Sequence, residues 1–199
     1  MALNIEDIKR LKNLTGVGLT DAKAALTDAG GDFDQALEAM RKKGLTKAEK
    51  KGEREAREGL VDTYLHSGRI GVVVEVNCET DFVARTDDFK EFVHDVAMHV
   101  AAANPEYVSA EEVPENVREA KAAEFSEKAK AEGKPENMID NIVAGMLKKH
   151  FAEKCLLDQP FIKNPDVTMD DLLKEHIAKL GENMVIRRFA RIELGQVEA

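Results

Sequence analysis

The sequence of 199 residues contains no tryptophan, two tyrosines and two cysteines, and it lacks any long apolar run. Aromatic residues make up only 5% of the chain, which leaves few platforms for stacking nucleic-acid bases. No apolar run approaches the roughly 20 residues that a transmembrane helix needs, so we expect no membrane association. Cys78 and Cys155 form no CxxC pair and no disulfide framework, which favours a reducing, cytoplasmic setting. The N-terminal stretch mixes acids into its apolar positions, which is not typical of a secretory or transit signal.

Charged residues are plentiful but unevenly distributed. They make up 34% of the chain beside 43% hydrophobic residues, a composition typical of soluble globular proteins. The net charge of −9 argues against a protein that coats nucleic acid. Residues 1–57 carry 12 basic and 10 acidic side chains, whereas residues 58–199 carry 17 and 28. The basic excess lies in residues 41–57, which we interpret as a solvated linker helix at a domain boundary; a nucleic-acid contact is the alternative, and no aromatic residue accompanies the charges.

The first 44 residues show helical periodicity in three segments. The apolar positions at helical spacing are Leu3, Ile5, Ile8, Leu11 and Leu14, then Leu19, Ala22, Leu26 and Ala29, then Phe33, Ala36, Leu37 and Met40. Asp32 with Gln35 predicts the start of the third helix, and Gly44 predicts its end. A core this small is marginal alone and is more typical of a docking module than of a catalytic domain. The glycine-rich turn before Leu19 lacks the spacing of a phosphate loop, so we interpret it as a tight interhelical turn.

The middle and the end of the chain show a period of two. Residues 60–66 and 69–76 flank Ser67-Gly68 and predict a hairpin, and residues 184–194 can supply a third strand. The positions expected to share faces towards the core are Ile70, Val72, Val74 and Val76 in one strand and Met184, Ile186, Ala190, Ile192 and Leu194 in the other. Helices that begin at Thr86 and Thr168 can cover this sheet. The pattern predicts an α+β fold with a three-stranded antiparallel sheet packed against helices.

A long helical excursion separates the covering helix from the last strand. Residues 114–154 predict a helical hairpin that turns at Gly133-Lys134-Pro135. The second arm carries an apolar stripe, which favours either an association surface or packing against its own domain. We therefore expect a docking module at residues 1–44, a charged linker helix at 45–58, and an α+β domain at 59–199 that mediates dimerisation.

The chain offers no constellation for chemistry. None of its five histidines has metal-ligand spacing, and no serine or cysteine lies in a nucleophile motif. The residues therefore predict no enzyme, no catalytic side chain, no metal and no cofactor.

Residues 75–85, EVNCETDFVAR, place two large apolar side chains inside a polar run between a strand and a helix. Phe82 can pack onto the following helix, or it can be an exposed aromatic anchor flanked by acids, as in an interface hot spot. The residues alone leave both interpretations open.

This segment resembles the EVNC[QE]TDFVA signature of the translation elongation factor Ts family. Residues 11–26, LKNLTGVGLTDAKAAL, resemble that family's other signature, and GKPENMIDNIVAGMLKKHF, LLDQPFI and LLKEHIAKLGENMVIRRF are also similar to it. The resemblance covers nearly the whole chain and is closest to the short form of the family, with one sheet subdomain. It departs at Lys12, where many relatives have arginine, and at Leu19-Thr20, where many have two methionines.

The resemblance implies a guanine nucleotide exchange factor that promotes GDP release from elongation factor Tu. A UBA-like three-helix module would dock on the nucleotide-binding domain of that partner, in its GDP-bound and nucleotide-free states. The positions that match the contact are Lys12, Leu19, Thr20, Asp21 and Lys23. The loop Thr80, Asp81, Phe82 and Val83 would disturb the partner's Mg²⁺ and phosphate site.

The resemblance also implies a homodimer in a two-to-two complex, with no direct nucleic-acid contact and no membrane. The alternative function is a ubiquitin-type or peptide-binding adaptor that uses the three-helix module, but that alternative leaves the 75–85 segment unexplained.

Overall fold

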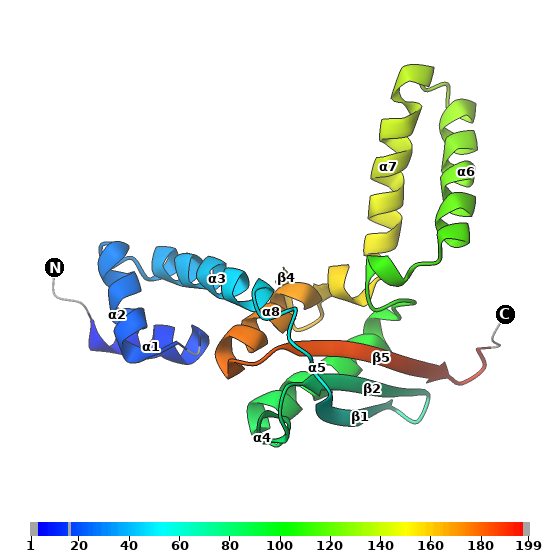
Figure 1. Cartoon of the computed structure of the whole chain (residues 1–199). Helices are drawn as coiled ribbons and strands as arrows, with labels where there is room; N and C mark the ends of the chain where they lie inside the picture. Colours follow the sequence, from blue (N-terminus) through cyan, green and yellow to red (C-terminus); the bar gives the residue numbers. More distant parts are fainter. Residues whose placement is uncertain (1–3, 16, 197–199) are drawn as a thin grey trace.

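A computed structural model of the chain describes residues 4–15 and 17–196. Figure 1 shows three parts: a helical module that contains the N-terminal helices at one end, a body built around a sheet, and a helical hairpin that projects from the opposite end. Leu3, the first apolar position of the predicted first helix, and Gly16, in the predicted interhelical turn, lie outside the described residues. Within those described residues, no helix combines the length and apolarity needed to cross a bilayer.

The N-terminal module consists of α1 (Ile5–Thr15), α2 (Leu19–Asp28) and the first half of α3 (Phe33–Glu49). As the periodicity predicts, the three helices bury one small core, which contains Ile8, Leu11, Ala22, Leu26, Ala36 and Met40. The carboxylate of Asp32 caps α3 by accepting a hydrogen bond from the Gln35 backbone N–H at 3.0 Å. Packing of three apolar faces therefore forms this module, and the cap sets where its third helix begins.

The predicted end of the third helix at Gly44 is wrong, because α3 continues without a break to Glu49. Glycine is a weak helix former, but here its lack of a side chain has a use. A Cβ placed on Gly44 would lie 3.3 Å from the Cβ of Ala178, so the glycine lets α3 pack closely on α8 (Met169–Leu180). Ala48, one turn later, is only 2% exposed and belongs to the core of the body. Beyond Glu49 the chain forms turns and then a strand, so residues 50–57 are not the expected linker helix, and the division into domains stays a prediction.

The body is an antiparallel sheet of β1 (Glu58–His66), β2 (Ile70–Cys78) and β5 (Met184–Glu193), in the order β1-β2-β5. The predicted hairpin is confirmed: Ser67 and Gly68 both have positive φ, and the Arg69 N–H donates to the His66 carbonyl at 2.9 Å. Two consecutive positive φ values match the right-handed twist of the flanking strands.

Helices α5 (Asp87–Ala103) and α8 pack with the sheet around one core, which confirms the α+β fold. Both predicted starts are present, because Thr86 accepts from the Phe89 N–H and Thr168 forms a reciprocal capping box with Asp171. The buried face of β2 is formed by Val72, Val74 and Val76, as its alternation predicts. The largest side chains of the core that are almost fully buried are Phe89, Phe92, Leu156, Met169 and Met184.

A β-bulge in β5 corrects the predicted face of the third strand. Glu75 pairs with Arg188 but its neighbour Val76 pairs with Ile186, so Arg187 is an extra residue. An extra residue reverses the alternation beyond it, because side chains point to opposite faces with a period of two. Met184 and Ile186 face the core as predicted. Beyond the bulge the expectation is wrong: the exposed residues are Ala190, Ile192 and Leu194, and Phe189 and Arg191 are the partly buried ones.

The predicted helical hairpin is formed by α6 (Glu115–Ala131) and α7 (Glu136–Ala152), and it projects from the body (Figure 1). Its apolar stripe packs mainly between the two arms, where Ala129, Ile139 and Val143 form a separate small core. A second cluster of Val113, Phe151 and Cys155 lies at its base. Four short elements that the sequence analysis did not predict connect the parts: η1 (Ala110–Glu112), η2 (Leu156–Asp158), β3 (Pro160–Phe161) and β4 (Asn164–Thr168).

Candidate partner-binding site

The segment that carries the 75–85 motif leaves β2 and forms a one-turn helix, α4 (Asp81–Ala84), before α5 begins. Two threonines bracket it. The Thr80 side chain accepts a hydrogen bond from the Val83 N–H at 3.5 Å, and the Thr86 hydroxyl donates to the Val83 carbonyl at 2.8 Å. We call residues 80–83 the exposed turn. It lies between the start of α4, which Thr80 caps, and the start of α5, which Thr86 caps.

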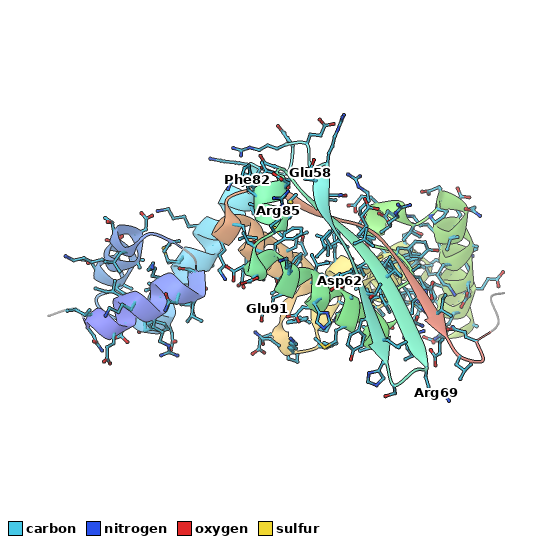
Figure 2. The ribbon with its side chains drawn as sticks, turned by 90° about the horizontal axis from the view of Figure 1, so that it is seen from below. Glu58, Asp62, Arg69, Phe82, Arg85 and Glu91 are labelled. Carbon is cyan, nitrogen blue, oxygen red and sulfur yellow. The ribbon has the colours of Figure 1, made fainter. Side chains whose placement is uncertain are left out.

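Phe82 is 79% exposed, so the interpretation in which it packs onto the following helix is wrong. Its neighbours explain this orientation: Ala84 is buried, and Val83 packs against the core of the body. In a helix of about 3.6 residues per turn, side chains two positions apart point to nearly opposite sides, so Phe82 points outwards when Ala84 points inwards. Figure 2 shows Phe82 and Arg85 projecting from the α4 end of the body, and Arg85 forms an ion pair of 2.7 Å with Asp81. The turn therefore presents one large apolar ring within a polar rim.

The base of the exposed turn is fixed by the connection between α8 and β5. One oxygen of the Glu182 carboxylate accepts from the Thr80 hydroxyl at 2.6 Å, and the other accepts from the Thr80 N–H at 3.0 Å. The Asn183 N–H donates to the Glu79 carboxylate at 2.6 Å. Asn183 is buried, and its side-chain amide donates to the Arg54 carbonyl at 2.6 Å. Two consecutive polar residues thus connect the turn to the segment that follows α3.

Sequence reasoning missed Glu182 and Asn183. The signal that was available is their position, since they stand between the helix-ending Gly181, with φ of 82°, and the first residue of β5. Polar residues in so short a connection often have backbone partners, but their partners here lie more than 100 residues away in the sequence. Only the tertiary fold brings them together.

The thiol of Cys78 lies directly beneath the turn and donates to the Thr80 carbonyl at 3.1 Å. Burial, with a smaller contribution from the Glu182 carboxylate, raises the pKa of Cys78 to about 11. This cysteine is therefore a protonated packing residue at neutral pH and not a nucleophile. Within residues 4–15 and 17–196, no three histidine, cysteine, aspartate or glutamate side chains are grouped so that they could hold a metal ion.

The five residues expected in the N-terminal contact lie near the junction of α1 and α2. Each has an exposed side chain: Lys12, Leu19, Thr20, Asp21 and Lys23. Leu19 is 56% exposed although it begins a helix whose other large apolar residue, Leu26, is buried. The structure therefore leaves all five positions accessible on α1 and α2, and it places the exposed turn on a different part of the chain, at α4 (Figure 1).

These features define an α+β chain with a helical N-terminal module and one exposed aromatic turn on its body. A family model described as Elongation factor TS matches residues 40–176. Elongation factor Ts of Carboxydothermus hydrogenoformans is 55% identical over 190 residues, which cover 95% of this chain and 88% of that protein. The corresponding protein of Moorella thermoacetica is 53% identical over 96% and 94% of the two chains, and that of Geobacter sulfurreducens is 51% identical over 98% and 91%.

The chain belongs to the elongation factor Ts family. This membership implies a nucleotide exchange factor for elongation factor Tu in the elongation phase of protein biosynthesis.

Proposed function

We propose that this chain promotes GDP release from elongation factor Tu through two separate contacts. The N-terminal module docks on the nucleotide-binding domain of the partner through the exposed positions Lys12, Leu19, Thr20, Asp21 and Lys23. The exposed turn, residues 80–83, inserts beside the Mg²⁺ and phosphate site. The observation that carries the proposal is the 79% exposure of Phe82 on a turn whose backbone is held from the body.

An aromatic side chain in that position fits the composition of an interface hot spot. Hot spots are typically large side chains that are buried only when the partner is present, surrounded by polar residues that exclude water. Phe82 has this setting, because Asp81 and Arg85 pair beside it. The Phe82 ring would be buried only in the complex. The free energy gained by this burial could offset the cost of displacing an element of the partner.

Exchange then follows from linkage and needs no covalent chemistry in this chain. If binding of the factor weakens the affinity for GDP, GDP weakens the affinity for the factor by the same ratio. An insertion that disturbs Mg²⁺ removes the largest positive charge near the diphosphate, and the nucleotide leaves faster. Rebinding of GTP reverses the same coupling and releases the factor.

The course of α3 supports a rigid connection between the two contacts. Its first half belongs to the module core, and its second half places Ala48 in the core of the body. A continuous helix of this kind resists bending where no proline or inserted residue interrupts it. The docking residues and the exposed turn would therefore reach the partner at a set separation.

A homodimer in a two-to-two complex is supported by the sheet face opposite the helices. The register places exposed Leu65 and Ile192 in one row with Gly71 between them, and Val73 in the next row. A single three-stranded sheet with an uncovered apolar face gains stability when a second layer covers it. In an isologous contact this face would pack against the same face of a second copy.

Substitution of Phe82 by alanine tests the exchange role. Loss of a hot-spot side chain typically costs about 2 kcal/mol or more of interaction, which corresponds to roughly 30-fold in exchange efficiency. The measurement is the rate at which elongation factor Tu loses a fluorescent GDP. The melting temperature should shift by less than about 2 °C, because exposed positions contribute little to stability.

Ile162→Ala is the matched control, since Ile162 is another exposed apolar side chain, located beside β3. It should leave the exchange rate unchanged. Asp81→Ala is a companion variant that should slow exchange and leave the fold intact. A Phe82→Ala protein that exchanges GDP at the normal rate would contradict the proposed insertion.

A further inference from the structure

The exposed turn is too short to orient itself. A helix of four residues, such as α4, has no independent stability, because the first turn fixes several dihedral angles for very few hydrogen bonds. Its direction must therefore come from contacts at its ends. At the N-terminal end, two side chains outside residues 80–83 form hydrogen bonds with Thr80: the Cys78 thiol donates to its carbonyl, and the Glu182 carboxylate accepts from its N–H and its hydroxyl. Of the two, Glu182 is the one that contacts the hydroxyl group that caps α4.

We propose that Glu182 is a positioning residue for nucleotide exchange, which holds Thr80 so that the exposed turn presents Phe82 in a fixed direction. The proposal rests on the proposed function of the turn and deepens it. Glu182 is not a partner contact itself in this account; it acts through Thr80.

The geometry of the contact carries the proposal. The carboxylate accepts two donors from one residue, the hydroxyl at 2.6 Å and the backbone N–H at 3.0 Å. The same hydroxyl oxygen also receives the Val83 N–H. The result is a chain of hydrogen bonds from the first turn of α4 through Thr80 to Glu182, in which an ionised acceptor strengthens each link.

Glu182 is itself well placed to act as an anchor. It follows Gly181, whose left-handed conformation ends α8, and it precedes Asn183, which is held by Glu79 and Arg54. The next residue, Met184, begins β5 and pairs with Cys78 of β2. The backbone of Glu182 is fixed by α8 on one side and by the sheet on the other. Its carboxylate can therefore restrain the position of Thr80 and of the turn that follows.

The first experiment measures amide hydrogen exchange by NMR in the free protein. Glu182→Ala should increase the exchange rates of the Thr80 and Val83 amides on the order of tenfold, the loss expected for a charge-assisted hydrogen bond. Glu182→Gln keeps one carbonyl acceptor and should give a smaller increase. The Phe89 amide, which is capped by Thr86, serves as an internal control and should keep its rate.

The second experiment measures GDP release from elongation factor Tu, at a temperature where all variants are folded. Glu182→Ala should reduce the maximal release rate on the order of tenfold. The concentration for half-maximal effect should change much less, because the N-terminal module is untouched. Glu182→Gln should recover part of the rate. Glu127→Gln, an exposed carboxylate on α6, should behave as the unmodified protein.

Phe82→Ala, measured alongside, separates the two proposals. If Phe82→Ala slows release while Glu182→Ala keeps both the normal rate and protected Thr80 and Val83 amides, the positioning role is overturned. Deprotected amides with a normal maximal rate overturn it as well, since the turn then needs no fixed direction. If Phe82→Ala itself releases GDP normally, the proposed function fails, and the amide exchange still reports whether Glu182 holds the turn.

Discussion

Two histidines, His99 and His176, pack within the body, and the hydrogen bonds of His99 require a neutral ring. The His99 Nδ1 accepts the Ile162 N–H at 3.3 Å, so its proton resides on Nε2, which donates to the Gln159 side chain at 3.0 Å. The His176 ring lies 4.6 Å from the ring of Phe92. Burial lowers the pKa of both histidines from the ordinary value of 6.5, because it penalises the charged imidazolium.

These shifts predict that the protein loses stability as the medium is acidified. A histidine whose pKa is lower in the folded state contributes stability above its unfolded pKa of 6.5, and the contribution is lost as pH falls through the folded value. Each such histidine can add a slope of up to about 1.4 kcal/mol per pH unit to the free energy of unfolding. Urea unfolding between about pH 7.5 and about pH 5.5, above the range of most carboxylates, measures this slope.

His99→Gln should reduce the slope, because it removes one of the two groups whose pKa is lowered by burial. An unfolding free energy that stays constant across this range would contradict a lowered pKa of His99 and His176 in the folded protein.

The two cysteines predict a second outcome at the residue scale. Both thiols are fully buried, and burial raises the pKa of Cys78 and of Cys155 to about 11. Native protein should therefore react with a thiol reagent only as fast as it unfolds, and both thiols should react at once in denaturant. Reductant should not change the mass of the native species. Rapid labelling of one thiol in native protein would show that its segment opens locally.

At the scale of elements, periodicity predicted most of the fold, because the spacing of apolar residues within a helix or strand identifies the face that it buries. The three helices of the module, the β1–β2 hairpin and the caps at Thr86 and Thr168 are local patterns of this kind. The bulge at Arg187 could not be predicted, since it depends on how β5 pairs with β2. The same limit applies to the candidate site: the motif located Phe82, but only the fold shows that Glu182 accepts two hydrogen bonds from Thr80.

Gly44 shows how a pattern typical of a helix end can have another cause. Because a Cβ on Gly44 would already lie 3.3 Å from the Cβ of Ala178, Gly44→Leu should push α3 and α8 apart. Overpacking of this kind typically costs about 1–3 kcal/mol. Gly145→Leu on α7 is the matched control, because a Cβ added to Gly145 would have no neighbouring atom within 4 Å.

The control should be neutral or stabilising, since leucine is a better helix former than glycine by up to about 1 kcal/mol. Thermal unfolding of both variants checks the difference. Equal melting temperatures would mean that α3 does not depend on close packing at Gly44.

At the scale of the whole molecule, α3 belongs to two cores, so truncations should separate stability from partner binding. A chain that begins at residue 55 lacks Ala48 and the packing of α3 on α8. It should fold but melt lower by roughly 5 °C, the shift that about 1–2 kcal/mol produces in a domain of this size. A chain that begins at residue 41 keeps the second half of α3 and should recover most of that loss.

Both truncated chains lack the five positions that we propose for docking, so both should bind elongation factor Tu far more weakly than the full chain. Circular dichroism and titration of the partner measure the two properties. Unchanged affinity would remove the docking role from the module.

The open sheet face gives the last prediction, which concerns assembly. Leu65 is 71% exposed and Ile192 is 73% exposed, and they lie in one cross-strand row with Gly71 between them. A Cβ added to Gly71 would lie 4.0 Å from the Leu65 side chain. If a second copy covers this face, sedimentation at tens of micromolar should give about 44 kDa, twice the 22.0 kDa of one chain. Ile192→Lys buries an unpaired charge in that contact and should give the monomer, because the desolvation cost exceeds what a small interface supplies. Met138→Lys, an equally non-conservative change on exposed α7, should leave the dimer intact. An unmodified chain that sediments as a monomer at these concentrations would refute the dimer, while GDP release by that monomer would show that exchange does not depend on it.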